Sequence, residues 1–255
     1  MSLQTSGAIS LANIQSEFGG SNPISMSEYY RGGSYTTGNN TNVPTSGAIS
    51  IGNFYGGIAF AVSGGTYYES GGYAYVKMTS SGYLTVAGSN TIQYIVVGGG
   101  AGGSNARGTG GEGGRVTTGT TTIGSGSHYV TIGGGGAGEY GSSCHGSDLH
   151  PGGTSSLGSI ASATGGVYSR CDIGCSYGVG ANGTQWVDGN YYGGWGGGGC
   201  DGYGFAGGLG GGGQGTGTNG GAGTNGLGGG GGGTGYGKYT SGAGGSGVVI
   251  IRWAL

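Results

Sequence analysis

Glycine constrains the fold of this chain more than any other residue type. Of its 255 residues, 78 are glycine. Glycine loses more backbone entropy on ordering than any other residue, roughly 0.5–1 kcal/mol relative to alanine inside a regular element. Over the whole chain this deficit is on the order of tens of kcal/mol. The glycine-rich part must therefore have a compensating source of stability, or it is a flexible linker.

The rest of the composition excludes several classes of protein. Only three prolines are present, which excludes a collagen. Seven basic and nine acidic residues are too few for a charged disordered chain. The net charge of −2 and the absence of a basic cluster predict no nucleic-acid partner. No apolar run approaches the ~20 residues of a membrane-spanning helix, and we expect no secretory signal peptide after Met1.

Composition divides the chain into three parts. Residues 1–57 are rich in Ser, Asn and Thr, residues 58–132 are strand-like, and residues 133–245 are dominated by glycine. We expect a mainly β fold. It comprises a short-helix segment at 1–57, a β-sandwich from 58–132 plus 246–255, and an inserted polyglycine II helix bundle with connecting loops at 133–245.

The first part contains an internal repeat, because residues 5–10 recur unchanged as residues 45–50. Ser10 and Ser50 are typical helix N-caps, and Ser25 with Glu28 has the spacing of a capping box. Helices of about two turns are not stable alone. We expect them to dock either on a partner or on the chain's own second part. The side chains assigned to such an attachment are Ile9, Leu11, Ile14, Phe18, Met26, Tyr29, Tyr30, Ile49, Ile51 and Phe54.

The second part alternates β-branched and aromatic residues with polar ones, which predicts strands. The predicted strands are 58–62, 73–78, 83–87, 92–97, 116–123 and 129–132. Short strands at this spacing are typical of a sandwich. Residues 247–253 are almost continuously apolar and are predicted to add a central strand to the same sheet.

The third part differs from a flexible linker, which pairs glycine with serine and has few aromatics. It contains many aromatic residues and all four cysteines. The ordered alternative is a bundle of helices with three residues per turn, packed side by side because glycine has no Cβ. Hydrogen bonds between such helices contribute roughly 0.5–1.5 kcal/mol each. Separate glycine runs of suitable length are 98–103, 108–114, 133–138, 193–199, 207–213 and 228–233.

Both ends of the chain resemble phage proteins. Residues 94–103 and 244–253 resemble the glycine-rich domain of many phage virion proteins, and residues 6–30 are similar to N-terminal segments of tail-fibre-like proteins of marine and cyanobacterial phages. The glycine-rich part also looks like the tip adhesin of T-even-type long tail fibres, and a similar insertion in a β-sandwich occurs in the ectodomain of anaplastic lymphoma kinase. The resemblance implies an adhesin attached to the virion, but it transfers no individual site residue.

The loops between the glycine runs, 139–151, 167–192 and 200–206, are the predicted contact surface. Tyrosine and tryptophan give contact area at low entropic cost and dominate binding hot spots. The alternative is that these rings only cover the outer face of the bundle. The receptor-binding candidates are Tyr140, Tyr168, Tyr177, Trp186, Tyr191, Tyr192, Trp195, Tyr203 and Phe205.

The cysteines and carboxylates leave their chemistry open. Cys144, Cys171, Cys175 and Cys200 are disulfide candidates, with free thiols and a metal site as alternatives, although the spacing does not match a paired zinc motif. Asp172, Asp188 and Asp201 offer a carboxylate pair for glycan cleavage, but Asp in glycine-rich loops is usually turn chemistry. We expect no enzyme activity, no cofactor and no metal.

These observations predict a phage tail-fibre or tail-tip protein that binds a host-surface glycan or outer-membrane protein. Residues 1–57 would attach it to other tail proteins of the virion, after assembly in the host cytoplasm. Alternatives are a purely structural virion component (a connector, plug or head decoration) and a glycan hydrolase. The oligomeric state is left open between a monomer and a homo-trimer.

Overall fold

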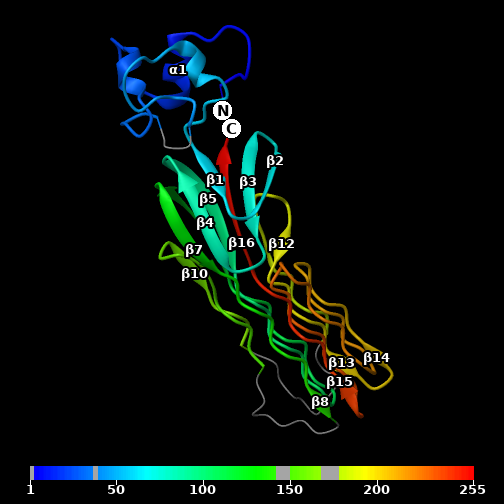
Figure 1. Cartoon of the computed structure of the whole chain (residues 1–255). Helices are drawn as coiled ribbons and strands as arrows, with labels where there is room; N and C mark the ends of the chain where they lie inside the picture. Colours follow the sequence, from blue (N-terminus) through cyan, green and yellow to red (C-terminus); the bar gives the residue numbers. More distant parts are fainter. Residues whose placement is uncertain (1–2, 37–39, 142–149, 168–177) are drawn as a thin grey trace.

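The computed structural model describes residues 3–36, 40–141, 150–167 and 178–255. The molecule is elongated, with an N-terminal module (residues 3–57) at one end, a β-sandwich in the middle and a glycine-rich bundle at the other end (Figure 1). The prediction of a mainly β fold is confirmed.

The N-terminal module is built from three equivalent turns. They are α1 (Leu11–Phe18), η1 (Met26–Tyr29) and η2 (Ile51–Phe54), and only α1 is an α-helix of two turns. Each begins with a capping box, in which the backbone N–H of Ser10, Ser25 or Ser50 donates a hydrogen bond to the side-chain oxygen of the residue three positions later. The fourth residue of each turn, Ile14, Tyr29 and Phe54, is fully buried. The repeat therefore has three members.

Hydrogen bonds join these three turns into a closed ring. The side chain of Gln15 donates to the carbonyl of Gly20, which precedes the second turn, and Tyr30 donates to Gly47, which precedes the third. Tyr55 then donates to Gly7, ahead of the first turn. The module thus buries its own apolar residues, and no partner is needed to cover them.

This burial changes the role of several predicted attachment residues. Ile14, Phe18, Tyr29 and Phe54 form the module's own core with Leu3 and Val43, because the ring brings their side chains together at its centre. Phe18 also lines a cleft towards Ala59 and Val86 of the second part of the chain. Ile51 is exposed, and the remaining attachment candidates are half-buried, namely Ile9, Leu11, Met26, Tyr30 and Ile49.

The sandwich consists of two five-stranded antiparallel sheets. One has the order β1-β4-β7-β9-β10, made of β1 (Ala61–Ser63), β4 (Gly82–Ala87), β7 (Gly126–Thr131), β9 (Ser155–Leu157) and β10 (Ala161–Ala163). The other has the order β2-β3-β16-β5-β6, made of β2 (Thr66–Ser70), β3 (Tyr73–Met78), β16 (Val248–Ala254), β5 (Asn90–Val97) and β6 (Val116–Ile123). The final strand is central, as predicted, and pairs with β3 and β5. Apolar side chains such as Val76, Leu84, Val96 and Ile251 fill the space between the sheets.

The border between sandwich and bundle differs from the expected ranges. Strands β9 and β10 belong to the sandwich although they lie within residues 133–245. Residues 98–115, expected with the sandwich, lie in the bundle. The reason is that sandwich strands continue directly into glycine segments, so the chain crosses the border many times (Figure 1).

The glycine bundle comprises residues 98–115, 133–141, 150–153, 164–167 and 178–247. In its central segment, residues 98–104, the backbone N–H groups donate in rotation to three neighbouring segments. The segment 109–115 accepts from Gly98, Ala101 and Ser104. The segment 150–153 accepts from Gly99 and Gly102, and the segment 242–245 accepts from Gly100 and Gly103. A direction that repeats at every third residue is the property of a helix with three residues per turn. The predicted arrangement is therefore confirmed.

A second central segment, residues 228–234, is surrounded in the same way. Its backbone N–H groups donate to carbonyl groups of residues 194 and 197, of residues 101 and 104, and of residue 221. Its own carbonyl groups accept from N–H groups within 108–114, 242–245 and 213–216. Both segments are buried by backbone alone. A Cβ on Gly100 would lie 2.0 Å from the carbonyl oxygen of Gly229. Glycine is thus required for the close approach that permits these hydrogen bonds.

Candidate binding surface at the distal end of the bundle

The end of the bundle farthest from the N-terminal module is formed by short two-stranded pairs (Figure 1). β8 (Tyr140–Gly141) pairs with β15 (Tyr239–Thr240), and β13 (Gly199–Cys200) pairs with β14 (Tyr203–Gly204). β13 and β14 flank the turn at residues 201–202, whereas β8 and β15 join two segments that are far apart in the chain. The turns at this end of the bundle carry larger and polar side chains because they lie outside the close-packed interior. They form the distal surface discussed below.

An ion pair fixes two of these turns. Arg107 Nε lies 2.7 Å from Asp201 Oδ2, and Arg107 Nη2 bonds the same oxygen. The backbone N–H of Tyr236 donates to Asp201 Oδ1 over 2.7 Å, and the Arg107 guanidinium lies 5.6 Å from the centre of the Tyr236 ring. The hydrogen bonds from Arg107 and then from Tyr236 lower the pKa of the Asp201 carboxyl. Since both charged groups are exposed, the pair orients the turns and adds little stability.

The backbone at Arg107 is in an unusual conformation. Ala106 and Arg107 have φ values of 52° and 64°, in the left-handed region that non-glycine residues rarely adopt. Such strain persists where the surrounding structure holds it, and it is common at functional sites. Here it directs the Arg107 side chain onto Asp201.

Exposed aromatic side chains lie on the strands and turns of the distal surface, and the Tyr236 ring contacts Arg107 of the ion pair. Tyr140, Tyr203 and Tyr236 are 68%, 52% and 64% exposed. The rings of Tyr203 and Phe205 pack edge to face at 5.7 Å. Exposed tyrosines on a fixed backbone combine an apolar ring with a hydrogen-bonding tip, and such side chains are typical of binding surfaces.

Two predicted receptor-binding residues have a different role. Trp186 and Tyr192 are buried against the outer face of the β2-β3-β16-β5-β6 sheet, together with Tyr75 and Leu227. They come from the loop of β11 (Thr184–Gln185) and β12 (Tyr191–Tyr192), which lies beside the sandwich (Figure 1). This sheet face is itself apolar and aromatic, so it needs a cover, and these rings are not available to a receptor.

The surroundings of Tyr192 agree with a buried structural role. Its hydroxyl donates to Asp188 Oδ2 over 2.7 Å, and burial followed by this hydrogen bond raises its pKa. Asp188 also accepts from the backbone of Asn190. Both described carboxylates of the predicted cleavage group, Asp188 and Asp201, therefore make structural hydrogen bonds.

The other candidates are distributed as follows. Trp195 is 37% exposed, and Tyr191 is half-buried. Tyr168, Tyr177, Cys144, Cys171, Cys175 and Asp172 lie outside the described residues. Cys200 is buried and disulfide-bonded. Within the described parts of the chain, no group of three or more His, Cys, Asp and Glu side chains is placed to hold a metal ion, and no helix has the length and apolarity to cross a membrane.

Inspection of the sequence missed Arg107 and Tyr236 as members of this surface. Arg107 meets Asp201 across 94 residues of chain, and no local pattern connects them. Tyr236 lies three residues beyond the glycine run 228–233, and a search for aromatic residues shortly after each run would have found it.

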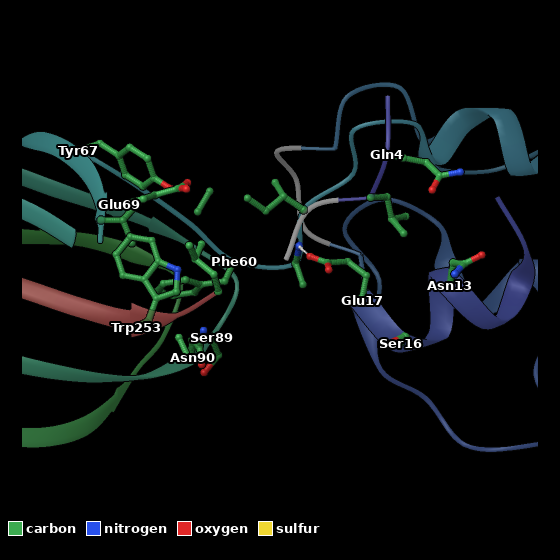
Figure 2. A pocket seen from close by; sticks show the side chains of 17 residues that line it. Gln4, Asn13, Ser16, Glu17, Phe60, Tyr67, Glu69, Ser89, Asn90 and Trp253 are labelled. Carbon is green, nitrogen blue, oxygen red and sulfur yellow. Dashed lines mark hydrogen bonds between the residues drawn. The ribbon is translucent and has the colours of Figure 1, made fainter. Parts of the chain in front are cut away.

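A cleft at the opposite end is the second candidate site. It has a volume of about 700 Å³ and lies between the N-terminal module and the sandwich. Figure 2 shows Glu17 on the module side facing Tyr67, Glu69 and Trp253 on the sandwich side. Tyr67 donates to Glu69, and burial together with this bond raises the pKa of Tyr67 to about 12. The volume lies within the range of small-molecule sites.

Comparison with known proteins identifies the main part of the chain. No curated protein sequence matches it. The family model described as a glycine-rich domain matches residues 78–254, which include the last seven strands of the sandwich and the whole bundle. Since this match covers more than half of its length, the chain belongs to the glycine-rich domain family.

Proposed function

We propose that the protein is a phage tail-fibre or tail-tip adhesin that binds a host-surface glycan or outer-membrane protein through its distal surface. The observation that carries this proposal is the position of Tyr140, Tyr203 and Tyr236. These exposed rings stand on turns held by the hydrogen-bonded glycine bundle. Rigid presentation favours binding because little side-chain and loop entropy is lost on association.

The N-terminal module is the proposed attachment point to other virion proteins. It has its own core, separate from the two cores that involve the sandwich, and it lies at the opposite end from the distal surface (Figure 1). An adhesin needs this separation, because one end is occupied by the virion while the other meets the host. The similarity of residues 6–30 to tail-fibre-like proteins supports the same assignment.

Adsorption measurements test the proposal. The purified chain is expected to bind cells or isolated envelope glycans of the host, and the triple variant Tyr140→Ala, Tyr203→Ala, Tyr236→Ala is expected to bind at least about tenfold more weakly. The matched control is Tyr67→Ala, which removes a tyrosine of 50% exposure from the other end of the molecule. Absent binding would instead indicate a purely structural virion component, and binding equally strong in the triple variant would show that the distal surface is not the contact site.

A further inference from the structure

We propose that the outer face of the β1-β4-β7-β9-β10 sheet is a second binding site, which takes a strand of uncharged polysaccharide. This face is separate from the distal surface and lies on the sandwich. Figure 1 shows β4, β7 and β10 at the margin of the molecule, with no other element drawn outside them.

Two tyrosines stand at the centre of this face. Tyr83 of β4 and Tyr129 of β7 are directly paired across the strands, and their rings pack edge to face at 5.1 Å. They are 62% and 50% exposed. Each ring is therefore oriented by the other and still open to solvent, so the pair offers two exposed apolar rings, inclined to each other by 68°, whose conformational entropy is already reduced.

Rows of small hydroxyl side chains flank the tyrosine pair on both sides. One row is Ser63, Thr85 and Ser127, and the other is Thr131, Ser156 and Ser162. Alternate residues along a strand are about 7 Å apart, so each row lies one step from the tyrosines. The hydroxyls of the first row are exposed and make no hydrogen bond within the described part of the chain. They are free to donate to and accept from a ligand.

The face carries no formal charge. The outward positions of its five strands are occupied by Tyr, Thr, Ser and Ala. Neither of the two ion pairs found among the described residues involves one of these positions. An uncharged surface matches an uncharged ligand, because a charged one would lose hydration without gaining a counter-charge. Pyranose rings present an apolar face of C–H groups and a rim of hydroxyls, which fits an aromatic pair between two hydroxyl rows.

On the opposite sheet, the aromatic outer face is covered by other side chains of the chain itself. There, Tyr75 is covered by Trp186 and Tyr192 from a bundle loop, and its hydroxyl accepts a hydrogen bond from Arg252. No comparable cover protects Tyr83 and Tyr129 within the described residues. Their exposure is thus specific to one side of the sandwich.

Affinity electrophoresis of the full chain tests this site. The probes are neutral polysaccharides, namely dextran, mannan, galactan and a β-glucan, with anionic alginate for comparison. We expect at least one neutral polysaccharide to retard the protein and alginate to have no effect. The double variant Tyr83→Ala, Tyr129→Ala should weaken the retardation roughly tenfold or more, and the double variant to Phe should retain it, because stacking needs the rings and not their hydroxyls.

The pair Tyr203→Ala, Tyr236→Ala distinguishes this site from the proposed receptor surface. These distal variants should leave the retardation unchanged, and circular dichroism should show that the sheet variants remain folded. The proposal is overturned if no neutral polysaccharide retards the chain, or if the distal variants and not the sheet variants abolish retardation. A concentration-dependent dimer that the sheet variants dissociate would also overturn it, since the occupant would then be a second copy of the chain.

Discussion

At the residue scale, glycine in the bundle is a packing requirement that differs from one position to the next. A Cβ on Gly231 would lie 1.9 Å from the carbonyl oxygen of Gly242, which is backbone and cannot rotate away. At Gly134, nothing lies within 4 Å of such an atom. Both positions belong to the same bundle and neither has a positive φ, so space alone separates them.

We predict that Gly231→Ala destabilises the protein and that Gly134→Ala does not. Forcing a methyl group into a closed backbone contact should cost at least about 1–3 kcal/mol. A change at an open position should stay within about 0.5 kcal/mol. Thermal unfolding of the two variants measures the difference. Equal effects at both positions would mean that the segments are not in contact as described.

The ion pair at the distal surface gives a prediction on pH. Because the pKa of Asp201 is lowered by Arg107 and the N–H of Tyr236, this carboxylate should titrate below the ordinary value for an aspartate. Its contribution to stability is complete above the pKa of the unfolded chain, near 4, and is lost as the pH falls through the lower folded pKa. NMR titration of the side-chain carboxyl carbon measures the midpoint.

Replacement of the partner controls that measurement. In Arg107→Gln, the midpoint for Asp201 should move up towards the ordinary value, since the largest cause of the shift is removed. A midpoint at or above the ordinary value in the unmodified chain would show that the two side chains are not paired in solution.

At the scale of elements, the sequence predicts those parts of the fold that are specified by a local motif or by a periodic residue pattern. The strands β3, β4, β5, β6, β7 and β16 follow from alternating or continuous apolar patterns, and their observed bounds agree within a few residues. The capping box of Ser25 follows from the Ser-x-x-Glu spacing, whereas Ser10 and Ser50, expected as N-caps, form capping boxes with the Asn three residues later. The three-residue period of the bundle follows from glycine having no side chain.

Other elements depend on contacts between residues that are distant in the sequence, and no local sequence pattern predicts these contacts. β9 and β10 are short strands of Ser, Ala and Leu, and they form because Val130 and Thr131 of β7 offer an edge for pairing. β2 is polar and pairs only with β3. The burial of Trp186 and Tyr192 cannot be predicted without knowing which face of the sheet is apolar and must be covered. For the same reason, the predicted contact loops do not include Arg107 and Tyr236, which the structure brings to Asp201.

Hydrogen exchange should reveal the difference between central and outer segments of the bundle. All seven backbone N–H groups of residues 98–104 donate to neighbouring segments, whereas Gly136 is the one residue of 134–138 whose N–H has a partner among the described residues. We predict that amides of 98–104 exchange at least about a hundredfold more slowly than those of 134, 135 and 137. Uniformly fast exchange, as in a flexible linker, would contradict the bundle and the proposed rigid surface with it.

At the scale of the whole molecule, the bundle extends the sandwich. β5 runs into residues 98–104, residues 109–115 lead into β6, and residues 244–247 lead into β16. The inner strand β5 and the central bundle segment 98–104 are thus continuous chain. This continuity holds the distal surface at a fixed position and in a fixed orientation relative to the sandwich.

The N-terminal module is joined to the sandwich much less extensively. Clefts of about 700 and 610 Å³ open at this junction, and the backbone N–H of Ala59 donates to Glu17 Oε1 over 3.1 Å. We therefore predict that residues 58–255 fold without the module. The truncation removes this hydrogen bond and the two between Ile58 and Asn40, and each loss costs roughly 1 kcal/mol, which corresponds to a fall in Tm of about 2–4 °C for a chain of this size.

Two measurements on the truncated chain test both its folding and the proposed attachment role. Calorimetry should give a cooperative transition near that of the full chain, and host-cell binding through the distal surface should be retained. In a phage that carries the truncation, incorporation of the protein into virions should be lost, because the module is the proposed anchor. If incorporation persisted while the remainder stayed folded, the anchor would lie in the sandwich or bundle and the proposed polarity of the molecule would be wrong.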